Sequence, residues 1–170
     1  MARQLWLLRH ADAEPHGTRE DSERRLTERG ERQARTAGIA LERLGVDFHA
    51  VLCSPKVRAQ RTAELAVESW PAQQRELLAV HRPLAGAFDA AQALAEMAGA
   101  PADGRVLLIG HEPDLSGVVA ELCGGRVEMK KAGLAIVRLQ GAGGELLALL
   151  RPVDLALIAG GVGGVPIHGE

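Results

Sequence analysis

Short apolar runs alternate with longer amphipathic stretches along most of the chain. The apolar runs predict strands over residues 4–9, 50–53, 77–80, 105–109, 134–139 and 145–150. The amphipathic stretches predict helices over residues 27–44, 55–69, 90–98 and from 112 to about 124. Strands that alternate with helices are typical of an α/β fold. We expect a three-layer α/β/α sandwich with a mainly parallel central sheet.

Local signals mark the ends of several of these elements. Thr27 can cap the first helix, and Gly45 can end it. Ser54 is expected to cap the second helix, which would then begin at Pro55. A glycine-rich turn over residues 141–144 predicts a hairpin between the last two strands, which adds an antiparallel element to the sheet.

The length of 170 residues suits one domain, and we place it over residues 1–153. Residues 154–170 contain a glycine-rich run, and we expect them to form a partly flexible C-terminal tail. Hydrophobic residues make up 46% of the chain but aromatic residues only 2%, so the core must consist of Leu, Ala, Val and Ile. The sequence gives no indication of an oligomeric state.

A net charge of −2 argues against a nucleic-acid partner, because such proteins need a basic surface. The chain has no long apolar run and no recognisable export signal, so we expect no membrane partner and a cytoplasmic location. Cys53 and Cys123 lie in apolar surroundings without metal-site spacing, and we interpret them as reduced, buried thiols.

Three segments with chemically capable side chains follow predicted strands. They are Arg9-His10, Ser54-Pro55 with Arg58 a turn later, and Gly110-His111. Ligand sites in sheets of this type collect at the carboxyl ends of the strands. We therefore expect the three segments to meet, although they are far apart in the sequence.

Together these side chains are suited to phosphoryl transfer. A neutral His10 imidazole can accept a phosphoryl group covalently. The guanidinium groups of Arg9 and Arg58 match phosphate oxygens, and His111 can donate a hydrogen bond to them. Taken singly, each residue also fits an ordinary surface or structural role. Their expected convergence favours the chemical interpretation.

Four motifs in order resemble the histidine phosphatase superfamily. They are Leu8-Arg9-His10-Ala11, Leu26-Thr27-x-x-Gly30-x-x-Gln33-Ala34, Ser54-Pro55-x-x-Arg58-Ala59-x-x-Thr62-Ala63 and Gly110-His111-Glu112-Pro113. The short chain is similar to the SixA-type phosphohistidine phosphatase branch. The resemblance implies a phosphoglycerate mutase-like fold, a phosphorylated nucleophile at His10, and binding of the phosphoryl group by Arg9, Arg58 and His111. It implies no metal and no cofactor.

The sequence departs from the superfamily pattern in two places. Ala11 stands where most members have Gly, which restricts the backbone there. Residues 81–88 contain no carboxylate, although many members carry a general acid in this segment; Asp89 is the nearest. An alkoxide leaving group gains about 10²–10⁴-fold from such an acid, whereas the imidazole of phosphohistidine leaves more easily. Asp12, Glu14 and Glu112 remain possible acids elsewhere.

The leading hypothesis is therefore a metal-independent phosphatase that acts on phosphohistidine in proteins through a phosphohistidine intermediate. A small-molecule phosphomonoesterase of the same superfamily is the alternative. Two other classes are a metal-dependent hydrolase using His10, Asp12 and His111, and a non-catalytic phosphate-binding module. Lys130-Lys131 could line a rim that attracts phosphate or form a solvated pair. The other histidines, at positions 16, 49, 81 and 168, are interpreted as ordinary surface or loop residues.

Overall fold

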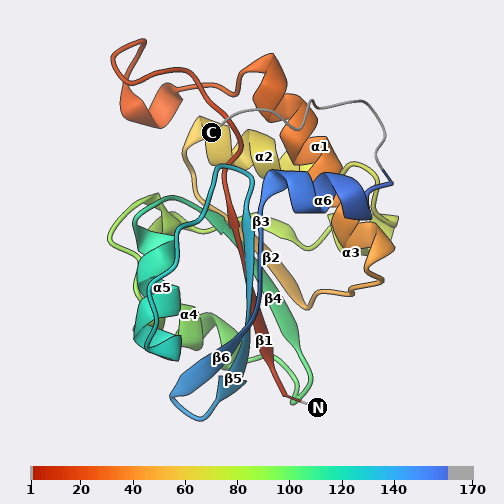
Figure 1. Cartoon of the computed structure of the whole chain (residues 1–170), viewed down its shortest axis with the longest axis vertical. Coiled ribbons are helices and arrows are strands. Elements are labelled where there is room, and N and C mark those ends of the chain that lie inside the picture. Colours follow the sequence, from red (N-terminus) through yellow and green to blue (C-terminus); the bar gives the residue numbers. More distant parts are fainter. Residues whose placement is uncertain (1, 161–170) are drawn as a thin grey trace.

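A six-stranded sheet runs through the centre of the molecule in the order β3-β2-β4-β1-β5-β6 (Figure 1). The computed structural model describes residues 2–160. The strands are β1 (Gln4–Arg9), β2 (Ala50–Cys53), β3 (Leu78–Val80), β4 (Arg105–Gly110), β5 (Leu134–Gln140) and β6 (Gly143–Leu150). The first four are parallel, and β5 is antiparallel to both its neighbours. The mainly parallel sheet with an antiparallel element is confirmed.

Helices cover both faces of the sheet, which completes the three layers (Figure 1). One side carries α1 (Glu28–Arg43), α2 (Val57–Val67), α3 (Ala72–Arg75) and α6 (Pro152–Ile158), and the other carries α4 (Ala90–Met97) and α5 (Asp114–Cys123). Two short 3-10 helices, η1 (Asp21–Glu23) and η2 (Arg82–Ala85), lie in the connections. Within residues 2–160, no helix is long and apolar enough to cross a membrane.

The core consists of two apolar clusters, one on each face of the sheet. Side chains alternate between the faces along β1. Trp6 and Leu8 belong to the cluster under α1, α2 and α6, whereas Leu5 and Leu7 belong to the one under α4 and α5. Because β1 is covered on both sides, its sequence is a continuous apolar run rather than an alternating one.

The predicted cap of α1 is confirmed and that of α2 is wrong. The Thr27 hydroxyl accepts a hydrogen bond of 3.0 Å from Gly30 N, and Gly45 ends the helix with φ of +65°. Helix α2, however, begins at Val57, and Lys56 occupies the N-cap position. The Ser54 side chain is bonded to a residue outside the helix, His111, and the chain passes through another turn before α2 starts.

Helix α6 crosses the position after residue 153 where the sequence predicts the end of the domain. Pro152–Ile158 form α6, which packs against α1. Leu155 is only 1% exposed, and Ala159 is buried in the same cluster. The helix is too short to show a clear amphipathic pattern, and the sequence prediction rested on the glycine-rich run after it. The remainder of the predicted tail, residues 161–170, lies outside the described residues.

The contribution of α6 to stability can be measured with a matched pair of variants. Leu155→Ala should lower the free energy of unfolding by about 2–5 kcal/mol, because it opens a cavity in the core. Leu157→Ala, on the same helix but with Leu157 73% exposed, should change it by less than about 0.5 kcal/mol. Urea unfolding measures both. Equal effects would contradict the packing of α6 onto the domain.

Candidate active site

The carboxyl ends of β2, β4 and β1 meet at one edge of the sheet and bring the three predicted segments together. The main-chain N–H of His10 donates to Gly110 O over 2.9 Å, and that of Ser54 donates to Ile109 O over 3.0 Å. The rings of His10 and His111 lie with their centroids 5.2 Å apart. The convergence expected from the topology is therefore confirmed.

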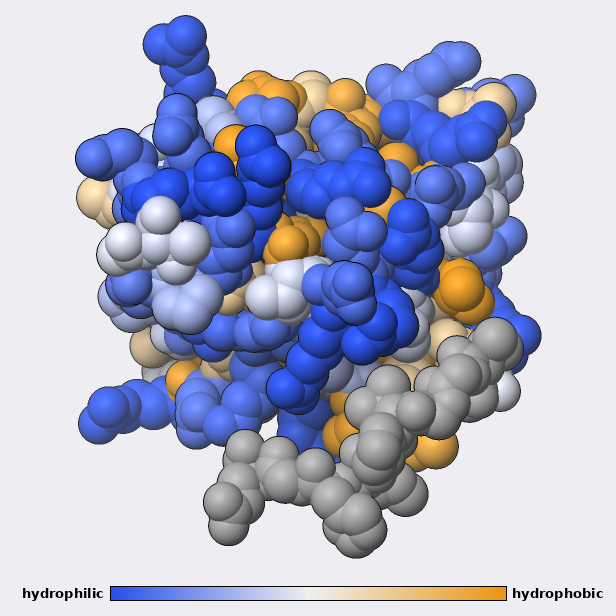
Figure 2. Space-filling model, turned by 90° about the horizontal axis from the view of Figure 1, so that it is seen from above, coloured by the Kyte–Doolittle hydropathy of each residue, from blue (hydrophilic) through white to orange (hydrophobic). Residues whose placement is uncertain are grey.

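A cavity of about 590 Å³ opens at these strand ends, and we call it the strand-end cavity. All four predicted residues, Arg9, His10, Arg58 and His111, line it. Its other lining residues are Ala13, Glu14, Pro15, His16, Asp21, Arg24, Lys56, Ala85, Gly86, Glu112, Pro113, Asp114 and Lys131. Figure 2 views the molecule from this end and shows a mostly hydrophilic face with small hydrophobic areas between the polar groups.

His10 is buried, and the ring nitrogen that faces Arg58 is unprotonated. Its Nδ1 lies 2.8 Å from Ala11 O, which can only accept, so Nδ1 carries the proton. Nε2 then has a free lone pair and accepts a hydrogen bond of 3.3 Å from Arg58 Nε. Burial lowers the pKa of His10 to about 3. The imidazole is therefore neutral near pH 7, as a nucleophile must be.

His111 is also a buried, neutral imidazole. Burial, followed by repulsion from Arg58, lowers its pKa to about 3. Its Nε2 lies 2.7 Å from the Ser54 hydroxyl, which already accepts a hydrogen bond from Lys56 N. Ser54 is thus free to donate its hydrogen to Nε2, and in that case Nδ1 carries the ring proton. Within residues 2–160 this buried Nδ1 has no hydrogen-bond partner.

The two predicted arginines are fixed by main-chain carbonyls. Arg9 Nη1 donates to Met129 O over 2.8 Å, and Arg58 Nη1 donates to Asp21 O. Burial lowers the pKa of both groups, but an arginine stays charged at any pH of interest. The Nε of Arg9 is buried and has no hydrogen-bond partner in the described part of the chain.

The motif that begins at Leu26 supports the loop after His10. The hydroxyl of Thr27 donates to the Asp12 carboxylate, and the Gln33 side chain accepts from Asp12 N. Gly30 allows the loop to approach α1 closely, because a Cβ there would lie 1.9 Å from Asp12 O. The residues of this motif therefore act on the main chain beside the nucleophile.

The motif that begins at Ser54 links α2 to the same loop. The hydroxyl of Thr62 accepts a 3.0 Å hydrogen bond from Ala11 N and donates to Arg58 O over 2.7 Å. Ala11 is fully buried and does not have the positive φ that would require glycine; within residues 2–160, the non-glycine residues with positive φ are Ala87 and Ala132. The departure from glycine at position 11 thus introduces no backbone strain.

Sequence reasoning missed several residues that shape the cavity. Asp21 contacts Arg58 and Lys56 from a loop that carried no motif, and the buried Arg24 contacts Asp21. Ala132 N donates to the carbonyls of both Arg9 and His10. Of these residues, only Asp21 and Arg24 could have been noticed in the sequence, because they belong to a cluster of charged residues before Leu26. A main-chain contact such as that of Ala132 cannot be recognised from the sequence.

The alternative metal site is not assembled. Its third ligand would be Asp12, but that carboxylate accepts hydrogen bonds from Lys131 and Thr27, both of 2.8 Å. Among residues 2–160, no three His, Cys, Asp or Glu side chains gather in a way that could hold a metal ion.

The two lysines of the predicted basic pair have different surroundings. Lys131 lines the strand-end cavity and pairs with Asp12, whereas Lys130 is exposed and pairs with Glu128. Of the other histidines, His16 lies exposed at the mouth of the cavity. His49 and His81 lie outside it, bonded to Arg105 N and near Glu96, respectively, and His168 is outside the described residues.

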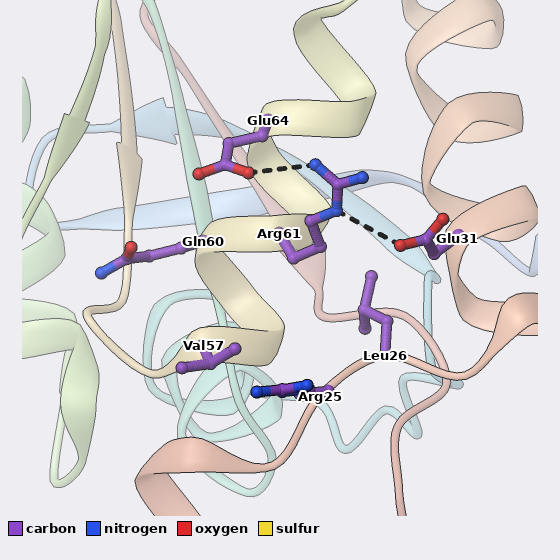
Figure 3. Close-up of a pocket in the computed structure, with 7 residues that line it drawn as sticks. All are labelled: Arg25, Leu26, Glu31, Val57, Gln60, Arg61 and Glu64. Atoms are coloured by element: carbon purple, nitrogen blue, oxygen red, sulfur yellow. Dashed lines mark hydrogen bonds and ion pairs between the residues drawn. The ribbon is translucent and has the colours of Figure 1, made fainter.

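A second, smaller hollow of about 270 Å³ lies against α1 and α2 (Figure 3). Arg61 crosses it and pairs with Glu31 on one side and Glu64 on the other. Its central cation is therefore already neutralised, and none of the four predicted residues lines it. The chemistry of the chain is concentrated in the strand-end cavity instead.

Comparisons with known proteins agree with this geometry. The model of the histidine phosphatase superfamily (branch 1) matches residues 5–79. An uncharacterized protein of Picosynechococcus sp. is 33% identical over 144 residues, which cover 79% of this chain and 84% of that protein. The protein histidine phosphatase SixA, solved with tungstate, has a TM-score of 0.74 and 27% identity, covering 89% of this chain and 99% of the other.

Two further structures extend the comparison. A candidate SixA from Nakamurella multipartitia has a TM-score of 0.73 and 28% identity over 90% of this chain and 98% of the other. The alpha-ribazole phosphatase of Shigella flexneri, with a TM-score of 0.62 and 19% identity over 88% and 96% of the two chains, shares the fold. The chain belongs to the histidine phosphatase superfamily, and its phosphoglycerate mutase-like fold is confirmed.

The two buried imidazoles should make stability depend on pH. Their pKa values fall from 6.5 to about 3 on folding, so between these values the unfolded chain binds more protons, and acid destabilises the fold. His10→Gln removes one such group. Its unfolding free energy should therefore fall less steeply from pH 6 to pH 4, by up to about 1.4 kcal/mol per pH unit. Parallel curves in urea titrations would contradict a neutral, buried His10.

Proposed function

We propose that this protein is a phosphatase that removes phosphoryl groups from phosphohistidine in other proteins, through an intermediate on His10 Nε2. In the first step the Nε2 lone pair attacks phosphorus, an Nε2–P bond forms, and the P–N bond of the substrate breaks. The electron pair of that bond stays with the substrate imidazole, which leaves as a neutral ring because its other nitrogen carries a proton. Water then attacks the phosphoryl group, which releases inorganic phosphate and restores Nε2, while the proton of the water passes to phosphate or solvent.

Three donor groups around the cavity suit a phosphoryl group. Arg9 Nε and His111 Nδ1 are buried nitrogens without partners among residues 2–160, and a bound oxyanion would supply acceptors for both. Arg58 Nε already points at His10 Nε2, so it would lie beside the transferring group. Donors fixed in this way can stabilise the negative charge as it moves in the transition state. The related SixA structure contains tungstate, a tetrahedral oxyanion.

The hydrogen bonding of the carboxylates around the cavity is the observation that supports phosphohistidine as the substrate. Four line it, namely Glu14, Asp21, Glu112 and Asp114, and every one accepts a hydrogen bond. Bonds from Arg19 and Lys56 lower the pKa values of Glu14 and Asp21, respectively. Residues 81–88 contribute only Ala85 and Gly86 to the lining of the cavity. Glu14 and Asp21 are therefore poorly suited to protonate an alkoxide, which favours the better leaving group, imidazole.

Turnover on two substrate classes tests this proposal. A protein phosphorylated on histidine should give a kcat/KM at least about 100-fold above that for sugar phosphates, because alkyl esters gain about 10²–10⁴-fold from a positioned acid. His10→Ala should abolish both activities, and EDTA should leave both unchanged. Higher efficiency on esters would support the small-molecule phosphomonoesterase instead.

Glu112 offers a sharper test of the missing acid. Its Oε1 accepts from Ser116 N at the start of α5, so we assign it a structural role. Glu112→Gln keeps an acceptor oxygen and should lower kcat on phosphohistidine by less than about fivefold, well short of the 10²–10⁴-fold typical of a lost general acid. A loss of that larger size, with the basic limb of the pH–rate profile removed, would identify Glu112 as the acid.

A further inference from the structure

One carboxylate in the strand-end cavity has more partners than the proposed reaction requires. Asp21 Oδ2 accepts from Lys56 Nζ over 2.8 Å and from Arg58 Nη2 over 3.3 Å. Its Oδ1 accepts from Arg24 Nε over 3.1 Å, and its main-chain carbonyl accepts from Arg58 Nη1. Two of these cations, Arg24 and Arg58, are buried. Asp21 therefore joins two buried guanidinium groups at the wall of the cavity.

The loop that carries Asp21 is fixed at both ends. Arg24 Nη1 donates to Glu14 O over 2.7 Å, and Arg25 N donates to the Glu14 carboxylate. Ala13 and Leu26 pair across the base of the loop as an isolated β-bridge. Asp21 itself begins the 3-10 helix η1. These contacts tie the position of its carboxylate to the segment that follows β1 and His10.

The contacts of Asp21 determine how the Arg58 guanidinium is turned. Both terminal nitrogens of Arg58 are bonded to Asp21, one to its carbonyl and one to its carboxylate. With both terminal nitrogens held, the Nε–H is directed at His10 Nε2. Without Asp21 the guanidinium could rotate about its side-chain bonds, and Nε would no longer be held against the nucleophile.

We propose that Asp21 is a positioning residue. It holds the guanidinium of Arg58 so that this group is directed at the phosphoryl group being transferred to His10 Nε2. This inference rests on the proposed role of His10 and Arg58. Asp21 is not a proton donor, because its bonds to Lys56 and its neighbouring arginines hold its carboxyl pKa far below the ordinary range. Its effect should appear in the transition state, where the fixed direction of a donor matters most.

Asp21→Asn tests the proposal, with Glu23→Gln as the matched control. Glu23 lies in the same 3-10 helix but is exposed. For each protein we would measure kcat and KM, and inhibition by inorganic phosphate and by orthovanadate, which mimics the five-coordinate transition state. Asp21→Asn should lower kcat by roughly 10- to 100-fold and weaken vanadate relative to phosphate by a similar factor, with little change in KM. Glu23→Gln should match the wild type.

Three results would overturn the inference. An unchanged kcat in folded Asp21→Asn protein would show that the contacts are structural only. Tighter binding of both anions with a higher kcat/KM would show that Asp21 merely competes with the phosphoryl group for Arg58 and Lys56. An unchanged vanadate-to-phosphate ratio, despite a lower kcat, would exclude a role in aiming a transition-state donor.

Two further measurements keep the outcome interpretable. If Asp21→Asn does not fold, Asp21→Glu retains the charge opposite the buried arginines. Its displaced carboxylate should still reduce the preference for vanadate over phosphate. A wild-type preference in Asp21→Glu would overturn the inference. The proposed function fails separately, when the wild-type protein hydrolyses no phosphorylated substrate or when His10→Ala retains activity. Only a wild-type enzyme that is active and depends on His10 can confirm or refute the role of Asp21.

Discussion

The hydrogen bond between Arg58 Nε and His10 Nε2 requires an uncharged imidazole whose lone pair faces a cation. That arrangement is possible because Ala11 O fixes the ring proton on Nδ1 and because burial disfavours a second proton. An exposed histidine in the same place would be protonated in part of the molecules near neutral pH and repelled by Arg58. The site therefore depends on the desolvation of His10, and that in turn depends on the close contact of the three strand ends.

Several residues of the matched motifs support this imidazole indirectly, through the main chain beside it. Thr62 binds Ala11 N, and Gly30 and Gln33 hold the main chain at Asp12. Ser54 orients the second imidazole. The motifs are thus spaced widely in the sequence because each anchors the same short segment, residues 10–12, from a different element of the fold. A positive φ at Ala132, whose N–H binds the Arg9 and His10 carbonyls, adds local strain at the same place.

Much of the fold, and the meeting of the four candidate residues in one cavity, could be predicted because both follow from strand periodicity and from topology. The strand that ends at Arg9 and the one that ends at Cys53 were predicted to the residue, since buried runs have sharp ends. The role of Ser54 was mistaken for a helix cap, because a local rule cannot reveal a partner 57 positions away. Helix α6 was missed, since its stability comes from Leu155 packing on the core rather than from its own pattern. Asp21 was missed because the sequence does not show which arginines a charged loop residue contacts in the fold.

The surroundings of the cavity explain why the leaving group matters. Five cations line it, namely Arg9, Arg24, Lys56, Arg58 and Lys131, and the carboxylates among them each accept a hydrogen bond. These cations suit the binding of a phosphoryl group, and under our proposal the substrate imidazole leaves without help from an enzyme acid. The central claim is that the group passes through His10 Nε2, and alkaline rapid-quench of the enzyme with phosphohistidine substrate, followed by peptide mass spectrometry, tests it most directly. We expect a transient phosphoryl group on His10; a label on another residue, or turnover with no label at any time, would contradict the account.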